Sequence, residues 1–157
     1  MKQRFTSKQT SINSTKAPAV YSMKRAVNVM TGKTVVDIGG GRFDTAAEAA
    51  RVYGAAVSIY DPFNRTPEHN AAVLAGSYDV AVISNVLNVI DSKAARGDVV
   101  RLAATKAAAL LITVYEGDGS GTGRQPPTVG KKTGAPLIIW TKSPPLSRVG
   151  MLPGLVV

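Results

Sequence analysis

The sequence predicts an α/β fold in which an open, mostly parallel sheet is covered by helices on both faces. Three observations lead to this prediction. Short runs rich in valine and isoleucine alternate with alanine-rich segments of helical length, as expected for strand–helix–strand units. The first run stops at three consecutive glycines, and the later runs stop at polar residues. The spacing between the runs suits right-handed crossovers between parallel strands.

Each element has its own local signal. Thr45 and Glu48 have the spacing of a capping box, with Asp44 or Thr45 as the cap. Pro67 suits the first turn of a helix, and Gly54 and Gly76 follow expected helix ends. The expected elements are, in chain order, a helix over 19–30, a strand over 34–38, a helix from 44 or 45 to about 53, a strand over 56–60, a helix from 67 to about 75, a strand over 78–84, a helix from about 93 to 107, a strand over 110–115 and a further strand over 137–141.

The 157 residues are enough for one hydrophobic core. Residues 1–18 are rich in serine, threonine and lysine, and we expect a flexible basic segment there. Residues 19–141 form the expected domain, which contains a long irregular loop over 117–134. Residues 142–157 contain three prolines, so we expect an irregular tail.

Composition excludes several classes of protein. No apolar run reaches the roughly 20 residues of a membrane span, so no membrane association is expected. The absence of cysteine excludes a disulfide scaffold, a thiolate zinc site and a cysteine nucleophile. His69 is the single histidine, so no multi-histidine metal centre is expected. The basic N-terminus lacks the apolar stretch of a signal peptide, which favours a cytoplasmic location.

The net charge of +9 is unevenly distributed. The first 36 residues carry seven basic residues and no acid, and the residues after Asp118 carry five basic residues and no acid. All ten acidic residues lie from Asp37 to Asp118, together with seven basic ones. Basic ends attract polyanions, which makes nucleic acid a candidate partner. The alternative is that the basic ends only keep the protein in solution.

The candidate site lies where the predicted strands end. Ligands of open parallel sheets bind beyond the carboxyl ends of the strands, near the point where the strand order reverses. Here those ends carry Asp37 and the glycines 39–41, then Asp61, then Ser84 and Asn85, and then Tyr115 and Glu116. Glycines let a ligand approach the backbone, and Asp61 follows them by about 20 residues, the place of an acid that accepts two ribose hydroxyls. These features predict a nucleoside site, with an ordinary turn and a solvated acid as the alternative.

The charges at this site separate two cofactor types. A dinucleotide fingerprint requires a third glycine where this chain has Asp44, and an acid there repels a phosphate. Asp37 is equally unsuited to a diphosphate but suits an amine-bearing ligand. S-adenosylmethionine carries a sulfonium and an ammonium and has no phosphate. The pattern therefore favours S-adenosylmethionine over NAD.

Four segments carry a family resemblance, namely DIGGGRFD at 37–44, YDPFNRTPEHN at 60–70, SNVLNVI at 84–90 and VYEGDGSGTG at 114–123. Together they resemble the class I S-adenosylmethionine-dependent methyltransferases, and more narrowly a small group common in phages and bacteria. The resemblance covers about residues 10–124 and implies a Rossmann-like sheet. The chain departs from the family in having Phe43 at the third glycine of the first motif. It also has room for about one strand–helix unit fewer than the full fold.

The resemblance implies roles for the strand-end residues. The methionine portion of the cofactor would lie against the glycine turn, and Asp37 would orient it; the implied cofactor-binding residues are Asp37, Gly39, Gly40, Gly41, Asp61, Ser84 and Asn85. Asn85 and Glu116 are the candidate catalytic residues, because an oxygen acceptor is needed to direct the lone pair of a nitrogen nucleophile. The Asn/Asp-Pro-Pro-Tyr motif of amino-methyltransferases is missing at 84–88.

The sequence thus predicts an enzyme that transfers a methyl group by in-line displacement to an unidentified acceptor, with nucleic acid slightly favoured. The alternative is a cofactor-binding or nucleic-acid-binding module that has the fold without the transfer activity. The shortened fold leaves open whether the substrate site has all its walls, and a homo-oligomer is one way in which a missing wall could be supplied.

Overall fold

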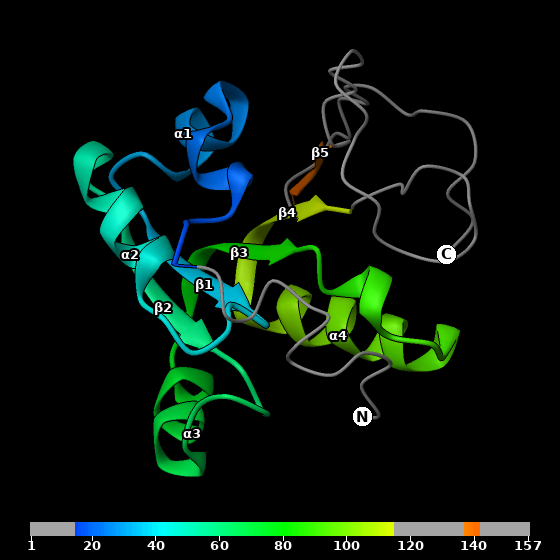
Figure 1. Ribbon diagram of the computed structural model, residues 1–157. Helices are drawn as coiled ribbons and strands as arrows, with labels where there is room; N and C mark the ends of the chain where they lie inside the picture. Colours follow the sequence, from blue (N-terminus) through cyan, green and yellow to red (C-terminus); the bar gives the residue numbers. More distant parts are fainter. Residues whose placement is uncertain (1–14, 115–136, 142–157) are drawn as a thin grey trace.

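The computed structural model describes residues 15–114 and 137–141, and these form an α/β domain (Figure 1). The five strands of its sheet are β1 (Thr34–Ile38), β2 (Ala56–Tyr60), β3 (Tyr78–Ser84), β4 (Ala107–Thr113) and β5 (Leu137–Thr141). The strand order is β2-β1-β3-β4-β5. The first four strands are parallel, and β5 is antiparallel to β4. The predicted shortened, mostly parallel Rossmann-like sheet is confirmed.

The order of the strands reverses at β1. The chain passes from β1 to β2 on one side, with Thr34 opposite Ala56, and then returns to place β3 on the other side, with Val35 opposite Val80. The space beyond the carboxyl ends of β1 and β3 is therefore the switch point at which ligands of such sheets bind.

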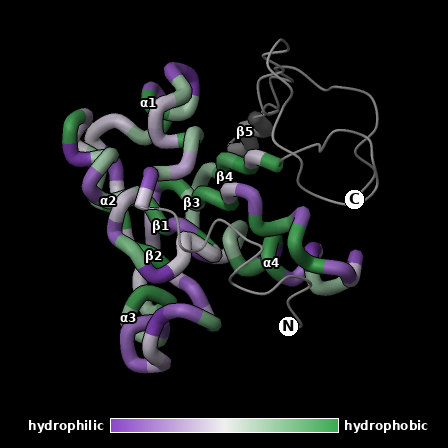
Figure 2. Tube along the Cα trace, viewed as in Figure 1, coloured by the Kyte–Doolittle hydropathy of each residue, from purple (hydrophilic) through white to green (hydrophobic). Residues whose placement is uncertain are grey.

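Helices cover both faces of the sheet. The helical elements are η2 (Ala19–Ser22), α1 (Lys24–Met30), α2 (Thr45–Ala50), η3 (Arg51–Tyr53), α3 (Pro67–Ala75), η4 (Leu87–Val89) and α4 (Lys93–Lys106). The core on one face joins η2, α1 and α2 to the sheet, and the core on the other face joins α3 and α4 to it. Alternation along each strand divides the residues between the two cores, so that Val35 faces one and Val36 the other. In Figure 2 the central strands are largely green, and purple gathers on the outer turns of the helices.

The predicted capping box does not form. Thr45 is the first residue of α2, and the cap is Asp44, whose side chain makes no capping hydrogen bond. The carboxylate of Asp44 instead pairs with Arg65, with Nη2 and Oδ1 2.8 Å apart. A tertiary ion pair has replaced the local interaction that the sequence suggested. The predicted place of Pro67 in the first turn of α3 is confirmed, and the helix is capped by Thr66, whose side chain accepts from the N–H of His69.

Two element boundaries differ from the prediction. The helix expected over 19–30 is divided into η2 and α1 by Met23, whose backbone is extended. The strand expected from residue 110 begins at Ala107, because Ala107 pairs with Tyr78 and Ala109 with Val80. Alanine favours helices, and the sheet pairing overrides that preference here.

Within the described ranges, no helix has the length and apolar character needed to cross a membrane. The predicted irregular loop over 117–134 and the tail over 142–157 lie outside the described residues, as does most of the predicted basic segment over 1–18.

Candidate functional site

The glycine turn after β1 is closely packed against its neighbours. Gly39 and Gly41 have φ angles of +82° and +80°, which side chains rarely adopt. A Cβ atom at Gly39 would lie 2.6 Å from Cγ2 of Val86, which belongs to the loop after β3. A Cβ atom at Gly40 would lie 2.9 Å from Cγ of Asp37. The protein's own packing therefore requires glycine at these positions, and the turn meets the β3 loop at the switch point.

Asp37 is a buried acid with one oxygen unused. It is 1% exposed, and Oη of Tyr21 donates to its Oδ2 at 2.7 Å. Its Oδ1 is buried and has no hydrogen-bond partner among the described residues. Burial raises the pKa of Asp37 to about 6; the hydrogen bond from Tyr21 lowers the pKa, and the charge of Asp61 raises it. Asp37 is thus a buried acceptor, and no cation is among the described groups that shift its pKa.

Asp61 is equally well buried, at 4% exposed, but its oxygens are engaged. Its Oδ2 accepts from the backbone N–H of Gly41 at 2.9 Å. Its Oδ1 accepts three hydrogen bonds, from the backbone N–H groups of Phe63 and Asn64 and from Nδ2 of Asn64. Asp61 therefore holds two loops together, and Oδ2 is its remaining acceptor for a ligand.

Two residues that the sequence analysis missed complete this arrangement. The Nε of Arg65 donates to the carbonyl oxygen of Gly41 at 2.8 Å, so that Asp61 and Arg65 hold the two polar groups of Gly41. Asn70 is buried, and its side chain bonds both the N–H and the C=O of Asp61. Both residues lie in the segment YDPFNRTPEHN that carries the family resemblance, but nothing in that segment distinguishes them from its other polar residues.

The end of β3 carries Ser84 and Asn85 as predicted. The hydroxyl of Thr113 on β4 donates to Oγ of Ser84 at 3.0 Å, and the N–H of Asn85 donates to the carbonyl oxygen of Thr113 at 2.9 Å. Asn85 has a φ of +57°, the left-handed backbone that non-glycine residues adopt only where the surroundings impose it. Further along the same loop, Oδ1 of Asn88 is buried without a partner among the described residues.

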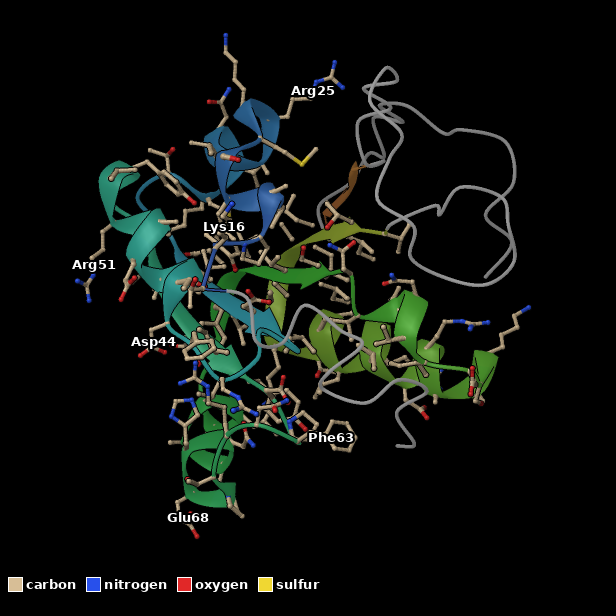
Figure 3. The ribbon with its side chains drawn as sticks, viewed as in Figure 1. Lys16, Arg25, Asp44, Arg51, Phe63 and Glu68 are labelled. Carbon is tan, nitrogen blue, oxygen red and sulfur yellow. The ribbon has the colours of Figure 1, made fainter. Side chains whose placement is uncertain are left out.

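Two phenylalanines beside the turn are exposed. Phe43 follows the glycine turn and is 37% exposed, and Phe63 in the loop after β2 is 53% exposed. Figure 3 shows Phe63 projecting away from the ribbon. Both loops are held by Asp61, so the exposed rings belong to the same end of the sheet as Asp37.

The remaining candidates lie elsewhere. Glu116, Tyr115 and Asp118 lie outside the described residues. Asp79, at the start of β3, accepts from the N–H and the hydroxyl of Thr34 at the opposite end of the sheet, a structural role. The Nε2 of His69 lies 2.8 Å from the carbonyl oxygen of Ile59, so its ring is engaged with the backbone of β2. Among the described residues, no group of three potential ligands could hold a metal ion.

Family models, curated proteins and solved structures give no significant match to this chain. Its function is therefore argued from the site. That site consists of a glycine turn, two buried aspartates with different bonding and a strained asparagine, gathered at the switch point of a parallel sheet.

Proposed function

We propose that this chain is an S-adenosylmethionine-dependent methyltransferase with a shortened Rossmann-like domain. The observation that carries the proposal is the unpartnered, buried Oδ1 of Asp37 beside the glycine turn. A buried carboxylate without a cation is unfavourable unless a ligand supplies a positive donor. The ammonium group of the amino-acid portion of S-adenosylmethionine is such a donor.

The other groups at this end of the sheet suit the same ligand. Asp61 retains acceptor capacity on Oδ2 for one ribose hydroxyl, whereas the sequence analysis expected two. The exposed ring of Phe63 offers a face on which a purine can stack. Asp37 and Asp61 disfavour a pyrophosphate, and Arg65, which binds Gly41 of the turn, is already paired with Asp44. The donor set therefore fits a cationic nucleoside better than a dinucleotide.

When bound, the cofactor would supply a methyl group on a good leaving group, so the chain itself mainly has to position the acceptor. Asn85 is the proposed catalytic residue. Its backbone is fixed by the hydrogen bond to Thr113, and its side chain makes no hydrogen bond to the residues that the structure describes. The side-chain oxygen is free to accept from a nitrogen nucleophile and to direct its lone pair. Glu116 remains the second proposed catalytic residue on the strength of the sequence.

Binding of the cofactor is tested by isothermal titration of the full chain with S-adenosylmethionine, S-adenosylhomocysteine and NAD. We expect the two adenosyl compounds to bind and NAD not to bind. Binding of NAD alone, or of none of the three, would overturn the proposal. Binding of the adenosyl compounds without transfer of labelled methyl to RNA, DNA or protein would favour the alternative, a binding module of the same fold.

Charge favours nucleic acid as the acceptor. The residues before Asp37 carry seven basic side chains and no acid, and contacts with phosphates make affinity fall with salt at a log–log slope of about 0.7 to 0.9 per phosphate. Removing residues 1–16 deletes four of these basic residues. We expect the truncated chain to show a shallower salt dependence for RNA or DNA and an unchanged affinity for S-adenosylhomocysteine. If the full chain binds neither RNA nor DNA at low salt, nucleic acid is excluded as the acceptor. Sedimentation of the same samples tests whether the chain forms a homo-oligomer.

A further inference from the structure

We infer that Tyr21 is a positioning residue that fixes Asp37, binding one carboxylate oxygen so that the other alone receives the amino group of the ligand. This inference rests on the proposed function and adds to it a residue outside all the motifs that suggested the function. It also assigns a task in the ligand site to η2, an element that precedes the first strand.

The hydrogen bond between these residues is built into the core. Tyr21 is 3% exposed, and its ring belongs to the apolar cluster that contains Ala26, Met30 and Val35. Its backbone N–H donates to the carbonyl oxygen of Pro18 at 3.0 Å, which closes the turn of η2. The phenol therefore approaches Asp37 from a fixed position, and the hydrogen bond at 2.7 Å joins two side chains that have little freedom to move.

Within the part of the chain that the structure describes, Tyr21 is the one side chain that donates a hydrogen bond to Asp37. It lies inside β1, where it pairs with Ile59 on one side and Val82 on the other, so the neighbouring backbone groups are used by the sheet. The charged and titratable groups that face it are Tyr21 and Asp61, and neither is a cation. Without Tyr21, the carboxylate would keep its burial and its repulsion from Asp61 but would lose its only donor among the described residues.

This arrangement predicts a pH dependence of ligand binding. Asp37 must be ionised to receive an ammonium group, and the donor bond from Tyr21 favours the ionised form. Replacing Tyr21 by phenylalanine raises the pKa of Asp37 further. The pH at which binding is half lost should therefore move upward in that variant. Tyr21 faces Asp37 and Tyr53, and no basic residue is among the groups that shift its pKa.

The test compares two ligands and two variants of the full chain by isothermal titration from pH 5 to 9. S-adenosylhomocysteine carries the amino group, and 5′-methylthioadenosine lacks it. Tyr21→Phe should weaken binding of the first ligand about tenfold, as expected for loss of one hydrogen bond to a charged group, and leave binding of the second unchanged. Tyr53→Phe is the matched control, because Tyr53 also has a buried hydroxyl near this core but does not contact Asp37. It should leave both affinities unchanged.

Each outcome has one meaning. Equal weakening of both ligands by Tyr21→Phe, or no weakening of either, would overturn the inference while leaving the proposed function standing. If the wild-type chain binds neither ligand, the proposed function itself fails and the inference fails with it. Should Tyr21→Phe prove unfolded by circular dichroism, Asp37→Asn provides the second test. This variant should bind S-adenosylhomocysteine more weakly, bind 5′-methylthioadenosine as the wild type does, and lose the pH dependence of binding. An affinity for S-adenosylhomocysteine equal to that of the wild type would also overturn the inference.

Discussion

Two aspartates at the ends of neighbouring strands have nearly the same burial and opposite bonding. Asp37 at the end of β1 is 1% exposed, accepts one hydrogen bond from Tyr21 and keeps an unpartnered oxygen. Asp61 directly after β2 is 4% exposed and accepts four hydrogen bonds, three of them from backbone N–H groups. Burial alone therefore does not distinguish an acid with an unused oxygen from one that holds a loop.

The difference follows from where each residue lies along its strand. Asp37 is inside β1, whose backbone donors are paired with β2 and β3. Asp61 lies one residue past its strand, where the N–H groups of Phe63, Asn64 and Gly41 have no sheet partner and turn toward the carboxylate. Backbone N–H groups without a sheet partner need another acceptor, and the carboxylate of Asp61 supplies it. Asp37 lies beside backbone groups that are already paired in the sheet, so it receives no such hydrogen bonds from the described residues.

The largest expected effect is the loss of the loop anchor. Asp61→Ala removes the acceptor of several buried or half-buried donors, each costing about 1 to 3 kcal/mol when unsatisfied, so we expect a loss of about 4 kcal/mol in the free energy of unfolding. Urea unfolding at pH 7 measures it. Asp98→Ala is the control, because the pair between Asp98 and Arg101 is exposed. A loss below about 1 kcal/mol for Asp61→Ala would show that water replaces these bonds.

The second effect concerns ionisation of Asp37. Its pKa in the folded chain is about 6, against 3.8 for an ordinary aspartate, so the folded state binds the proton more tightly. The resulting stabilisation is complete below pH 3.8 and is lost as the pH rises through about 6. Asparagine cannot ionise. The free energy of unfolding of the wild type relative to Asp37→Asn should therefore fall by about 2 kcal/mol between pH 4 and pH 7.5.

Urea unfolding of both proteins at the two pH values gives this difference, and other titrating groups cancel in it. A difference that stays constant with pH would mean that burial does not raise the pKa of Asp37 above that of an ordinary aspartate.

A smaller effect is expected at Arg65, which holds the carbonyl oxygen of Gly41 while Asp61 holds its N–H. Arg65→Lys keeps the charge but loses the Nε donor to the carbonyl oxygen of Gly41. We expect a loss of about 2 kcal/mol in the free energy of unfolding, because hydrogen bonds from charged groups contribute about 1.5 to 3 kcal/mol. Arg101→Lys, on the exposed surface of α4, is the control and should change stability little. An equal effect of the two changes would remove Arg65 from the loop anchor.

The smallest effect is expected at Tyr53, whose hydroxyl can be compared with the unpartnered Oδ1 of Asp37. The hydroxyl of Tyr53 is buried without a partner among the described residues. Tyr53→Phe removes that polar group and should raise the free energy of unfolding by about 1 kcal/mol at every pH. Thermal unfolding measures the change. A decrease in stability would show that this hydroxyl has a partner, and the same question would then arise for Oδ1 of Asp37.

The sequence predicted much of the framework. Local signals such as the valine-rich run before Gly39, Pro67 after Thr66 and the glycine at 54 placed the strands and helices close to their observed bounds. The capping box at Thr45 and Glu48 was wrong, because Arg65 draws Asp44 into an ion pair across the loops. The proposed ligand, the acceptor and the role of Glu116 stay predictions.

What the sequence determined by itself is the alternation of strands and helices, since burial on a sheet and burial on a helix impose different periods on the apolar residues. It also determined that polar residues end the strands. Only the tertiary structure decided which acid at those ends keeps an unused oxygen. Tyr21 lies 16 residues before Asp37, and Gly41 lies 20 residues before Asp61. A hydrogen bond between such distant residues depends on how the helices and loops pack against the sheet, and a pattern of neighbouring residues does not encode it.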